Sequence, residues 1–239
     1  MKITVCKNYD EMSAVAAKAI AELIKNKPDC VLGLATGSTP EGMYAKLVDM
    51  CKAGDISFSK VTSVNLDEYY PLEPDNEQSY RYFMNKNLFD HVDIDKAKTF
   101  VPNGLAKDPE KEGKDYDAMI EKLGGVDLQI LGIGRNGHIG FNEPATYLIP
   151  GTHVTDLTPS TIEANARFFA SENDVPKQAL TMGIGTILAA KKILLLVSGK
   201  DKAAAVARLL EGKITTECPA SFLALHGDVT LIVTEDAMN

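Results

Sequence analysis

Residues 131–144 (LGIGRNGHIGFNEP) combine four glycines with one histidine and one glutamate. Glycine lets the backbone approach a ligand closely, so a stretch of this kind suits a binding loop. His138 and Glu143 can form an oriented imidazole–carboxylate pair, which transfers protons near neutral pH. A lone histidine is more commonly structural, but the surrounding glycines favour a functional role. The stretch lacks a second histidine and the HExxH spacing, so it does not predict a metal site.

The same stretch also matches a dinucleotide-binding fingerprint. Gly132, Gly134 and Gly137 fit GxGxxG, and Asp156 follows at about the required 20 residues. That fingerprint needs a helix to begin at its third glycine, whereas a glycine, an asparagine and a proline interrupt residues 140–144. It also belongs in the first βα unit and not in the middle of a chain. We therefore do not expect a dinucleotide at this stretch.

A second candidate is the turn at residues 35–40 (ATGSTP). Gly37 permits a tight turn, Ser38 or Thr39 can cap a helix, and Pro40 suits a first helical position. Free backbone amides at a helix start bind anions, which predicts a phosphate ligand. No GK[ST] follows, so hydrolysis of a nucleoside triphosphate is disfavoured. An ordinary capped strand–helix turn is the alternative.

A third candidate is acidic. Residues 65–70 (NLDEYY) end an apolar run, and Asp67 is adjacent to Glu68. Neighbouring side chains on a strand point to opposite sides, so one of the two faces a crevice. A partly desolvated carboxylate gains basicity and can act as a general base. A solvated acidic loop is the alternative.

Arg167, Lys200 and Lys202 form a looser set of cations. The two lysines follow the apolar run Ile193–Val197 and lie near a predicted helix start. A second turn of this kind in an acidic protein suggests cations gathered around a phosphate. A solvated helix face is the alternative.

The elements that must position these residues alternate along the chain. Short runs rich in Val, Ile and Leu are apolar on both faces, as parallel strands between two helix layers are. They are Ile3–Cys6, Val31–Ala35, Val61–Leu66, Val126–Ile133, Ile193–Val197 and Val229–Val233. Amphipathic segments between them are Glu11–Ile24, Gly42–Met50, Ser79–Phe89, Asp115–Leu123 and Lys202–Leu210, the last with Asp201 and Gly212 as expected caps. This order predicts a doubly wound α/β sheet, whose ligands bind outside the carboxyl ends of the strands.

The chain is predicted to form a single domain over residues 1–239, because no repeat, low-complexity tract or Pro/Ser-rich linker divides it. Residues 144–183 are the least regular region. Both a mobile lid and a plain surface excursion fit that irregularity.

Composition limits the classes of partner. Of 239 residues, 45% are apolar and 24% charged, which is typical of a globular protein, and the net charge of −8 disfavours nucleic acid. The longest strongly apolar run, Ile193–Val197, is too short to span a membrane. The first residues lack a secretory signal, and the four scattered cysteines are typical of reduced thiols. We therefore expect a cytoplasmic protein.

Together these motifs resemble the glucosamine-6-phosphate deaminase family, whose members convert glucosamine 6-phosphate to fructose 6-phosphate and ammonia in amino sugar catabolism. The resemblance covers about residues 31–235, and several long motifs in order are more specific than any one alone. The motifs are ATGSTP (35–40), NLDEYY (65–70), SYRYFMNKNLFDHVDI (79–94), GRNGHIGFNEP (134–144), RFF (167–169), SGKDKA (198–203) and CPASFLALH (218–226). The resemblance implies a three-layer α/β/α fold with a mostly parallel sheet.

The resemblance also implies roles for single residues. Asp67 is the base that removes the C2 proton, and His138 is the acid and base of ring opening, supported by Glu143. The phosphate binds at Gly37, Ser38, Thr39, Arg167 and Lys202, and residues 162–181 close over the substrate as a lid. The chemistry needs neither a cofactor nor a metal, and we expect a monomer or a small homo-oligomer.

One position departs from the family pattern. Many members carry aspartate where this chain has Asn136, which completes a carboxylate–histidine–carboxylate relay. An amide oxygen can orient an imidazole N–H but cannot neutralise an imidazolium. We therefore hypothesise that His138 relies on Glu143 alone for a compensating charge. Longer members also carry a C-terminal extension associated with hexamers and allosteric activation, so we expect a non-allosteric form.

Two other functions fit parts of the sequence. A 6-phosphogluconolactonase has a related fold and a glycine–histidine loop, but ester hydrolysis needs no C2 base, and residues 141–144 (FNEP) favour the deaminase. The sugar-phosphate-sensing domain of a transcriptional regulator shares the fold type. It would need a basic DNA-binding module, for which a first strand at Ile3 leaves no room.

Overall fold

Seven strands form the central sheet of the computed structural model, which describes residues 1–166, 169, 171 and 174–238. Every neighbouring pair in this sheet is parallel. In spatial order the strands are β1 (Lys2–Cys6), β10 (Val229–Thr234), β9 (Ile193–Val197), β6 (Leu128–Leu131), β2 (Val31–Leu34), β3 (Thr62–Asn65) and β5 (Thr99–Phe100). All six strands expected from the apolar runs are confirmed. β5 was missed, because a pair of residues carries no periodic pattern.

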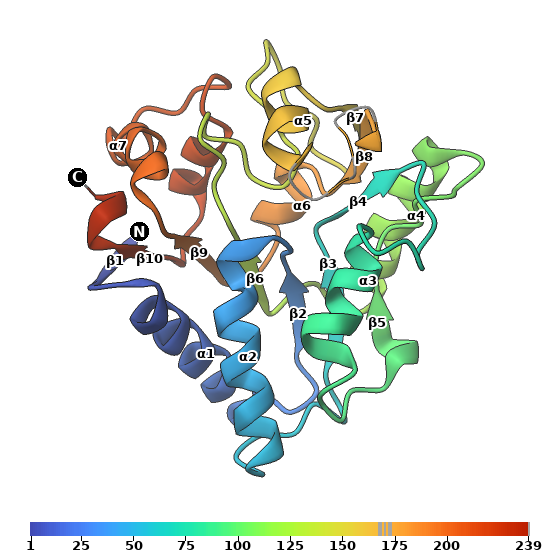
Figure 1. The fold of residues 1–239 in the computed structure, drawn as a ribbon, viewed down its shortest axis with the longest axis vertical. Helices are drawn as coiled ribbons and strands as arrows, with labels where there is room; N and C mark the ends of the chain where they lie inside the picture. The colour runs from blue at the N-terminus through green and yellow to red at the C-terminus, as the bar shows by residue number, and fades with distance from the viewer. Residues whose placement is uncertain (167–168, 170, 172–173, 239) are drawn as a thin grey trace.

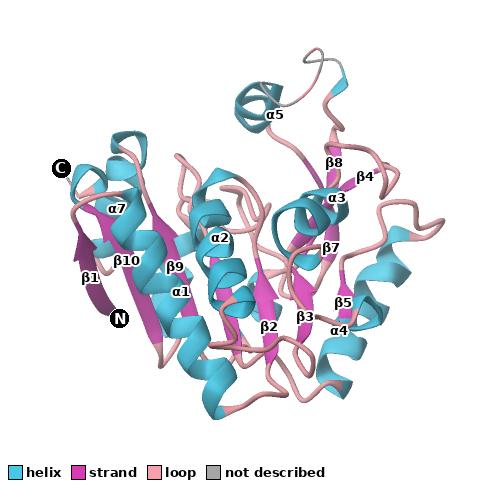
Figure 2. Cartoon of the chain, turned by 60° about the horizontal axis from the view of Figure 1, so that its bottom comes forward, coloured by secondary structure: helices cyan, strands magenta, loops and turns pink. Residues whose placement is uncertain are grey.

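Helices cover both faces of this sheet. Successive side chains of a strand point to opposite faces, and every residue of β2, β6 and β9 is buried. Figure 2 shows α1 and α2 side by side in front of the strands, where α1 contacts β1, β9 and β10. The helices are α1 (Tyr9–Asn26), α2 (Ser38–Lys52), α3 (Tyr80–Met84), α4 (Pro109–Lys122), α5 (Pro159–Ala166), α6 (Ile184–Leu188) and α7 (Ala203–Leu210). The expected three-layer α/β/α fold with a parallel sheet is confirmed.

A smaller antiparallel sheet stands above the carboxyl ends of the central strands (Figure 1). Its order is β4 (Asp67–Tyr70), β8 (Gln178–Thr181) and β7 (His153–Asp156). Residues 144–183, expected to be irregular, therefore contain two strands and the helix α5. The passage from the central sheet to the small one is a single residue, because β3 ends at Asn65 and β4 begins at Asp67. Leu66 lies between them, and its backbone bonds to Leu34 and Met182.

Each sheet has its own apolar cluster. The large cluster fills the space between the central sheet and its helices. A small cluster lies under the second sheet and brings together the rings of Tyr69, Tyr80, Phe141 and Phe169, whose centroids are 4.8–6.1 Å apart in the contacting pairs. Phe141 belongs to the glycine-rich stretch, so this cluster anchors that stretch to the smaller sheet.

Among the described residues, no helix is both long enough and apolar enough to cross a membrane.

Candidate active site

The candidate residues gather at one edge of the central sheet. The strands β9, β6 and β2 are neighbours and run parallel, so their carboxyl ends share an edge. The turn at residues 198–202 follows β9, the glycine-rich stretch at 132–144 follows β6, and the turn at 37–39 follows β2. The stretch that carries His138 therefore lies between the two turns expected to bind phosphate.

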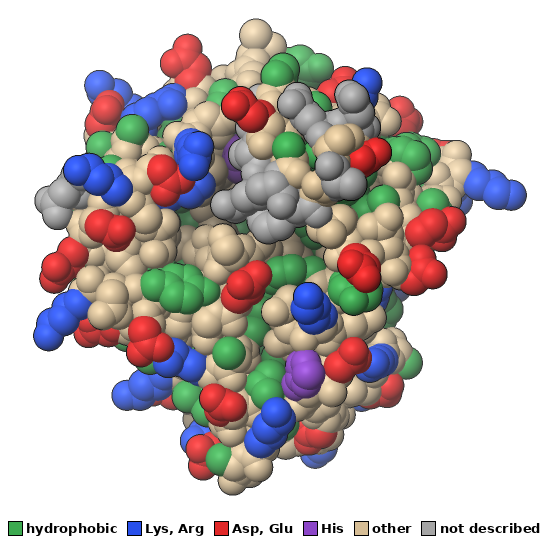
Figure 3. All heavy atoms as spheres, in the orientation of Figure 1, with side chains coloured by type: hydrophobic (Ala, Val, Ile, Leu, Met, Phe, Trp, Pro, Cys, Tyr) green, Lys and Arg blue, Asp and Glu red, His purple; other side chains and the backbone are tan. Residues whose placement is uncertain are grey.

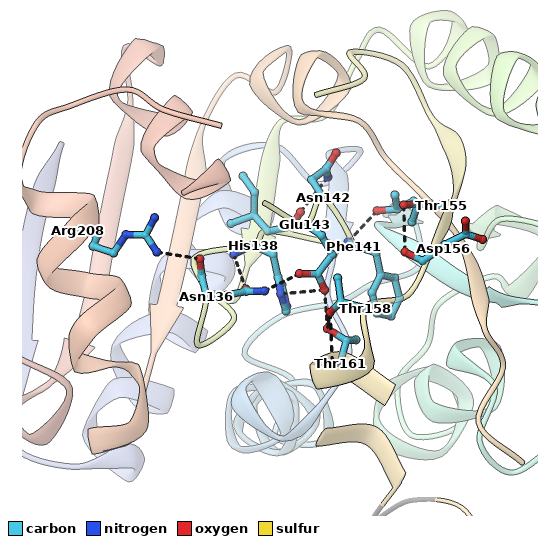
Figure 4. A network of polar contacts seen from close by, with 12 residues as sticks. Asn136, His138, Phe141, Asn142, Glu143, Thr155, Asp156, Thr158, Thr161 and Arg208 are labelled. Carbon is cyan, nitrogen blue, oxygen red and sulfur yellow. Dashed lines mark hydrogen bonds and ion pairs between the residues drawn. The ribbon is translucent and has the colours of Figure 1, made fainter. Parts of the chain in front are cut away.

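His138 and Glu143 approach each other within the glycine-rich stretch (Figure 4). The Nδ1 atom of His138 lies 3.3 Å from Oε1 of Glu143, although the two are not aligned as a hydrogen bond. The contact is therefore electrostatic whenever the imidazole is protonated. The imidazole lies directly over Gly134, where a Cβ atom would come 2.2 Å from His138 Cε1. Glycine at 134 thus makes room for the ring.

Glu143 is a buried carboxylate with several partners. Asn136 Nδ2 donates to its Oε2 at 2.6 Å, and the hydroxyl of Thr161, from α5, donates to its Oε1. Burial by itself raises the pKa of Glu143, but the interactions with His138, Thr161 and Asn136 outweigh burial, so the pKa is lowered. Glu143 therefore stays ionised at neutral pH beside the imidazole.

Among the described residues, no hydrogen bond joins the Asn136 side chain to the imidazole. Its amide oxygen accepts a bond from the backbone N–H of His138 at 3.2 Å, and its amide nitrogen donates to Glu143. An amide oxygen is able to orient an imidazole N–H, but here the side chain turns toward the carboxylate. Asn136 positions Glu143 instead.

Asp67 lies against the same stretch from the smaller sheet. It begins β4, pairs with Thr181 of β8, and its side chain is buried. A Cβ atom at Gly140, two residues after His138, would lie 3.7 Å from Asp67 Oδ2. The carboxylate makes no hydrogen bond within the described part of the chain. Burial, and then the nearby charge of Glu68, raise the pKa of Asp67 to about 8.

Glu68 points away from this site. Its carboxylate accepts bonds from the backbone N–H groups of Tyr69, Tyr80 and Arg81 at 2.9–3.0 Å. Two of these amides belong to the first turn of α3, so Glu68 holds the start of that helix. The two adjacent carboxylates therefore have separate surroundings, as their positions on a strand suggested.

The turn at 37–39 begins α2. Gly37 has a φ of 88°, which suits glycine, and precedes the first helical residue, Ser38. No described side chain caps this helix, so the expectation that Ser38 or Thr39 does so is wrong, and Pro40 is the third helical residue instead of the first. The first amides of α2 therefore have no side-chain acceptor among the described residues, which leaves them suited to an anion.

Lys202 ends the 3-10 turn Lys200–Lys202 after β9. Its Nζ lies 4.0 Å from Asp201 Oδ2, and the same oxygen lies 2.7 Å from Nε of Arg135. The expectation that Asp201 caps the next helix is wrong, because α7 begins at Ala203 without a cap from any side chain that the structure describes. Gly212 follows α7 with a φ of 73°, as expected of a C-terminal glycine.

Arg167 lies outside the described residues, as do residues 168, 170, 172 and 173 of the expected lid over 162–181. Charged side chains of both signs are interspersed on the face shown in Figure 3. This face therefore carries local groups of cations and not a broad positive surface.

Three contributors to the site were missed by sequence reasoning. Thr161 bonds to Glu143, the hydroxyl of Thr181 accepts the backbone N–H of Phe141 at 3.0 Å, and Arg135 joins the glycine-rich stretch to the turn after β9. Both threonines lie in the region that looked irregular, and no spacing pattern marks them. Arg135 could have been suspected from its place beside Asn136 in the motif.

Known proteins are similar to this chain in sequence. The family model for glucosamine-6-phosphate isomerases and 6-phosphogluconolactonases matches residues 7–232. A glucosamine-6-phosphate deaminase of Clostridium perfringens is 61% identical over 237 residues, covering 99% of this chain and 98% of that protein. One of Clostridium beijerinckii is 58% identical over 239 residues, covering 100% and 99%.

Solved structures agree in fold. A structure described as a monomeric glucosamine-6-phosphate deaminase matches with a TM-score of 0.98 and 51% identity, and each chain is covered completely. The 6-phosphogluconolactonase of Trypanosoma cruzi matches with a TM-score of 0.79 at 22% identity, covering 99% of this chain and 95% of that one. The second likeness concerns the fold alone.

Proposed function

The chain is an enzyme that belongs to the family of glucosamine-6-phosphate isomerases and 6-phosphogluconolactonases, and we propose that it converts glucosamine 6-phosphate and water to fructose 6-phosphate and ammonia. The relatives named glucosamine-6-phosphate deaminase, at 58–61% identity, support the reaction. The observation that carries the assignment to this site is the placement of Asp67. This buried carboxylate, with no hydrogen-bond donor among the described residues, lies against the loop that bears an imidazole–carboxylate pair.

Ring opening comes first, because only the free aldehyde at C1 acidifies the hydrogen at C2. In this proposal His138 moves the proton from O1 to O5 as the C1–O5 bond breaks. The imidazolium that forms on the way is stabilised by Glu143, which the bonds from Asn136 and Thr161 keep ionised.

Asp67 then removes the C2 proton. A carboxylate whose pKa is raised to about 8 is a much stronger base than an exposed one, so its ionised form suits this weakly acidic hydrogen. The product is an enolamine with a C1–C2 double bond. Return of a proton to C1 gives a ketimine at C2, water adds to C2, and ammonia leaves to give the ketone of fructose 6-phosphate.

The phosphate anchors the sugar at C6 while these steps proceed at C1 and C2, the other end of the substrate. We assign it to the amides of the turn at 37–39, to Lys202 and to Arg167. A group that stays bound throughout positions C1 and C2 between Asp67 and His138, which is how binding energy from a remote group accelerates chemistry.

We further propose that the chain acts as one α/β domain, with residues 162–181 as a lid, in the cytoplasm and as a monomer or a small homo-oligomer. All four cysteines are free thiols, which fits a reducing compartment. The relative described as monomeric supports the smaller assembly.

The reaction is tested by offering glucosamine 6-phosphate to the wild type, to Asp67→Asn and to Asp75→Asn, with ammonia and fructose 6-phosphate measured separately. Asp75 is an exposed aspartate close by in sequence and serves as the matched control. We expect equimolar products from the wild type and from Asp75→Asn, and none above background from Asp67→Asn. Hydrolysis of 6-phosphogluconolactone without release of ammonia from the amino sugar would instead assign the chain to the lactonases.

A further inference from the structure

Three of the four glycines in residues 131–144 make room for side chains of this same chain. A Cβ atom at each would come within 3 Å of a neighbouring atom. The distances are 2.2 Å from His138 Cε1 at Gly134, 2.6 Å from Cys218 Sγ at Gly137 and 2.8 Å from Thr181 Oγ1 at Gly140. Gly137 and Gly140 also have positive φ values of 91° and 56°. Packing and conformation therefore account for glycine at these three positions.

Gly132 is different. Its φ lies outside the left-handed region, so an ordinary side chain fits its backbone. A Cβ atom there would meet no described atom within 4 Å. Neither the conformation nor the packing of the described residues requires glycine at this position.

Gly132 also occupies a central place in the site. It directly follows β6, whose carboxyl end lies between those of β2 and β9. The turn at 37–39 and the turn ending at Lys202 therefore stand on either side of it. A sugar phosphate that reaches both turns must pass over the end of β6.

We propose that Gly132 is the floor of the substrate site and that the bound sugar phosphate lies in van der Waals contact with its Cα atom. A side chain here would occupy the place of the ligand, which makes Gly132 a position that determines whether substrate fits. This inference rests on the proposed function for the identity of the sugar phosphate, but the contact itself does not depend on which reaction follows.

The proposal separates folding from binding. Alanine at a position with a compatible backbone and free space leaves the fold intact, and loss of glycine restricts the unfolded chain and is neutral or mildly stabilising. The same methyl group overlaps the bound ligand. Overpacking of this kind weakens binding by about tenfold or more.

Gly227 provides a matched control. It too has a φ outside the left-handed region, and a Cβ atom added to it would meet no described atom within 4 Å. Unlike Gly132, it precedes β10, at the amino ends of the strands. Gly132→Ala and Gly227→Ala therefore add the same group in open space at opposite edges of the sheet.

The experiment measures the thermal midpoint of the wild type and both variants, alone and over a concentration series of fructose 6-phosphate and of 6-phosphogluconate, together with the KM for glucosamine 6-phosphate. We expect unchanged midpoints without ligand, and a Kd and a KM raised about tenfold or more in Gly132→Ala only. An unchanged Kd in Gly132→Ala, or a fall of its midpoint without ligand, would overturn the proposal.

The two proposals fail in different ways. If the wild type releases no ammonia, the assignment of the deaminase reaction is wrong. A ligand that stabilises the wild type then still shows whether Gly132→Ala weakens the binding of that ligand. If the wild type turns over but Gly132→Ala binds ligand equally well, only the contact at Gly132 is wrong.

Discussion

Glu143, within the glycine-rich stretch, and Asp67, packed against that stretch, are two buried carboxylates with contrasting hydrogen-bond partners. Glu143 receives bonds from Asn136 and Thr161 and lies beside an imidazole, so its pKa is lowered. Burial, and then the charge of Glu68, raise the pKa of Asp67 to about 8, and no bond from the described residues offsets them. Similar burial therefore yields a fixed anion in one case and a strong base in the other, and the difference comes from the partners.

The largest expected difference concerns turnover. In the proposed mechanism, removal of the base at C2 leaves no other route to the enolamine, whereas sugar rings also open slowly without help. We therefore expect Asp67→Asn to lower kcat by about 10³-fold or more and Glu143→Gln by about 10²-fold. Ammonia release at saturating glucosamine 6-phosphate measures both. A greater loss in Glu143→Gln would reverse the assignment of the two roles.

The stability of Asp67→Asn should change with pH. The folded protein holds the Asp67 proton up to about pH 8, whereas the unfolded chain loses it near 3.8, so wild-type stability is full below 3.8 and declines as pH rises toward 8. The asparagine of the variant cannot ionise, so the variant does not lose stability in this way. Its free energy of unfolding should rise relative to that of the wild type by at most about 1.4 kcal/mol per pH unit over this window. Urea unfolding at pH 5, 6.5 and 8 tests this, and a constant difference would contradict it.

Glu143→Gln should show the opposite dependence. The folded pKa of Glu143 lies below the unfolded value of 4.5, so its charge stabilises the fold above pH 4.5 and that contribution is lost as pH falls through the folded pKa. We expect the variant to be less stable than the wild type at pH 7, by about 1–3 kcal/mol. The gap should narrow as the pH falls from 4.5 through the folded pKa. Urea unfolding over a series of pH values from 7 into acid measures the gap, and a gap that does not change with pH would argue for lost packing instead.

The smallest effect is expected from Asn136→Asp. A second carboxylate would stand 2.6 Å from Glu143 Oε2, where the amide now donates a bond. Two carboxylates at this short distance keep a shared proton up to a higher pH. The acidic limb of the pH–rate profile should therefore shift to higher pH, and activity at pH 6 should fall severalfold. The profile of kcat/KM against pH measures this, with Asn103→Asp, an exposed position, as the control. An unchanged acidic limb would show that Asn136 does not govern Glu143.

The central sheet could be predicted because its strands are apolar on both faces, and β9 (ILLLV) is the clearest case. The smaller sheet could not. Its strands β4 (DEYY) and β7 (HVTD) are polar, and β4 pairs with β8 from more than a hundred residues away. Local pattern carries no information about such a pairing.

The candidate site likewise has residues that could be predicted from the sequence and residues that could not. His138 and Glu143 could be picked out because an imidazole and a carboxylate share one glycine-rich stretch, whereas the choice of Asp67 over Glu68 came only from the resemblance to the deaminase family. Thr161 could not be predicted, since its contact depends on where α5 packs in three dimensions, and the direction of the Asn136 side chain could not, since it depends on how the glycine-rich stretch folds back on itself. The expected cap by Asp201 failed for a related reason, because its carboxylate pairs with Arg135, which is distant in sequence.

The single residue between β3 and β4 limits how this protein can be recombined. Because one continuous segment serves both sheets, the smaller sheet is no exchangeable module. A chimera that borrowed residues 144–183 from a relative but kept its own β4 would combine Asp67 and β4 of one parent with the pairing strand β8 of the other. Crossover points that respect the fold must transfer residues 65–70 and 178–182 together.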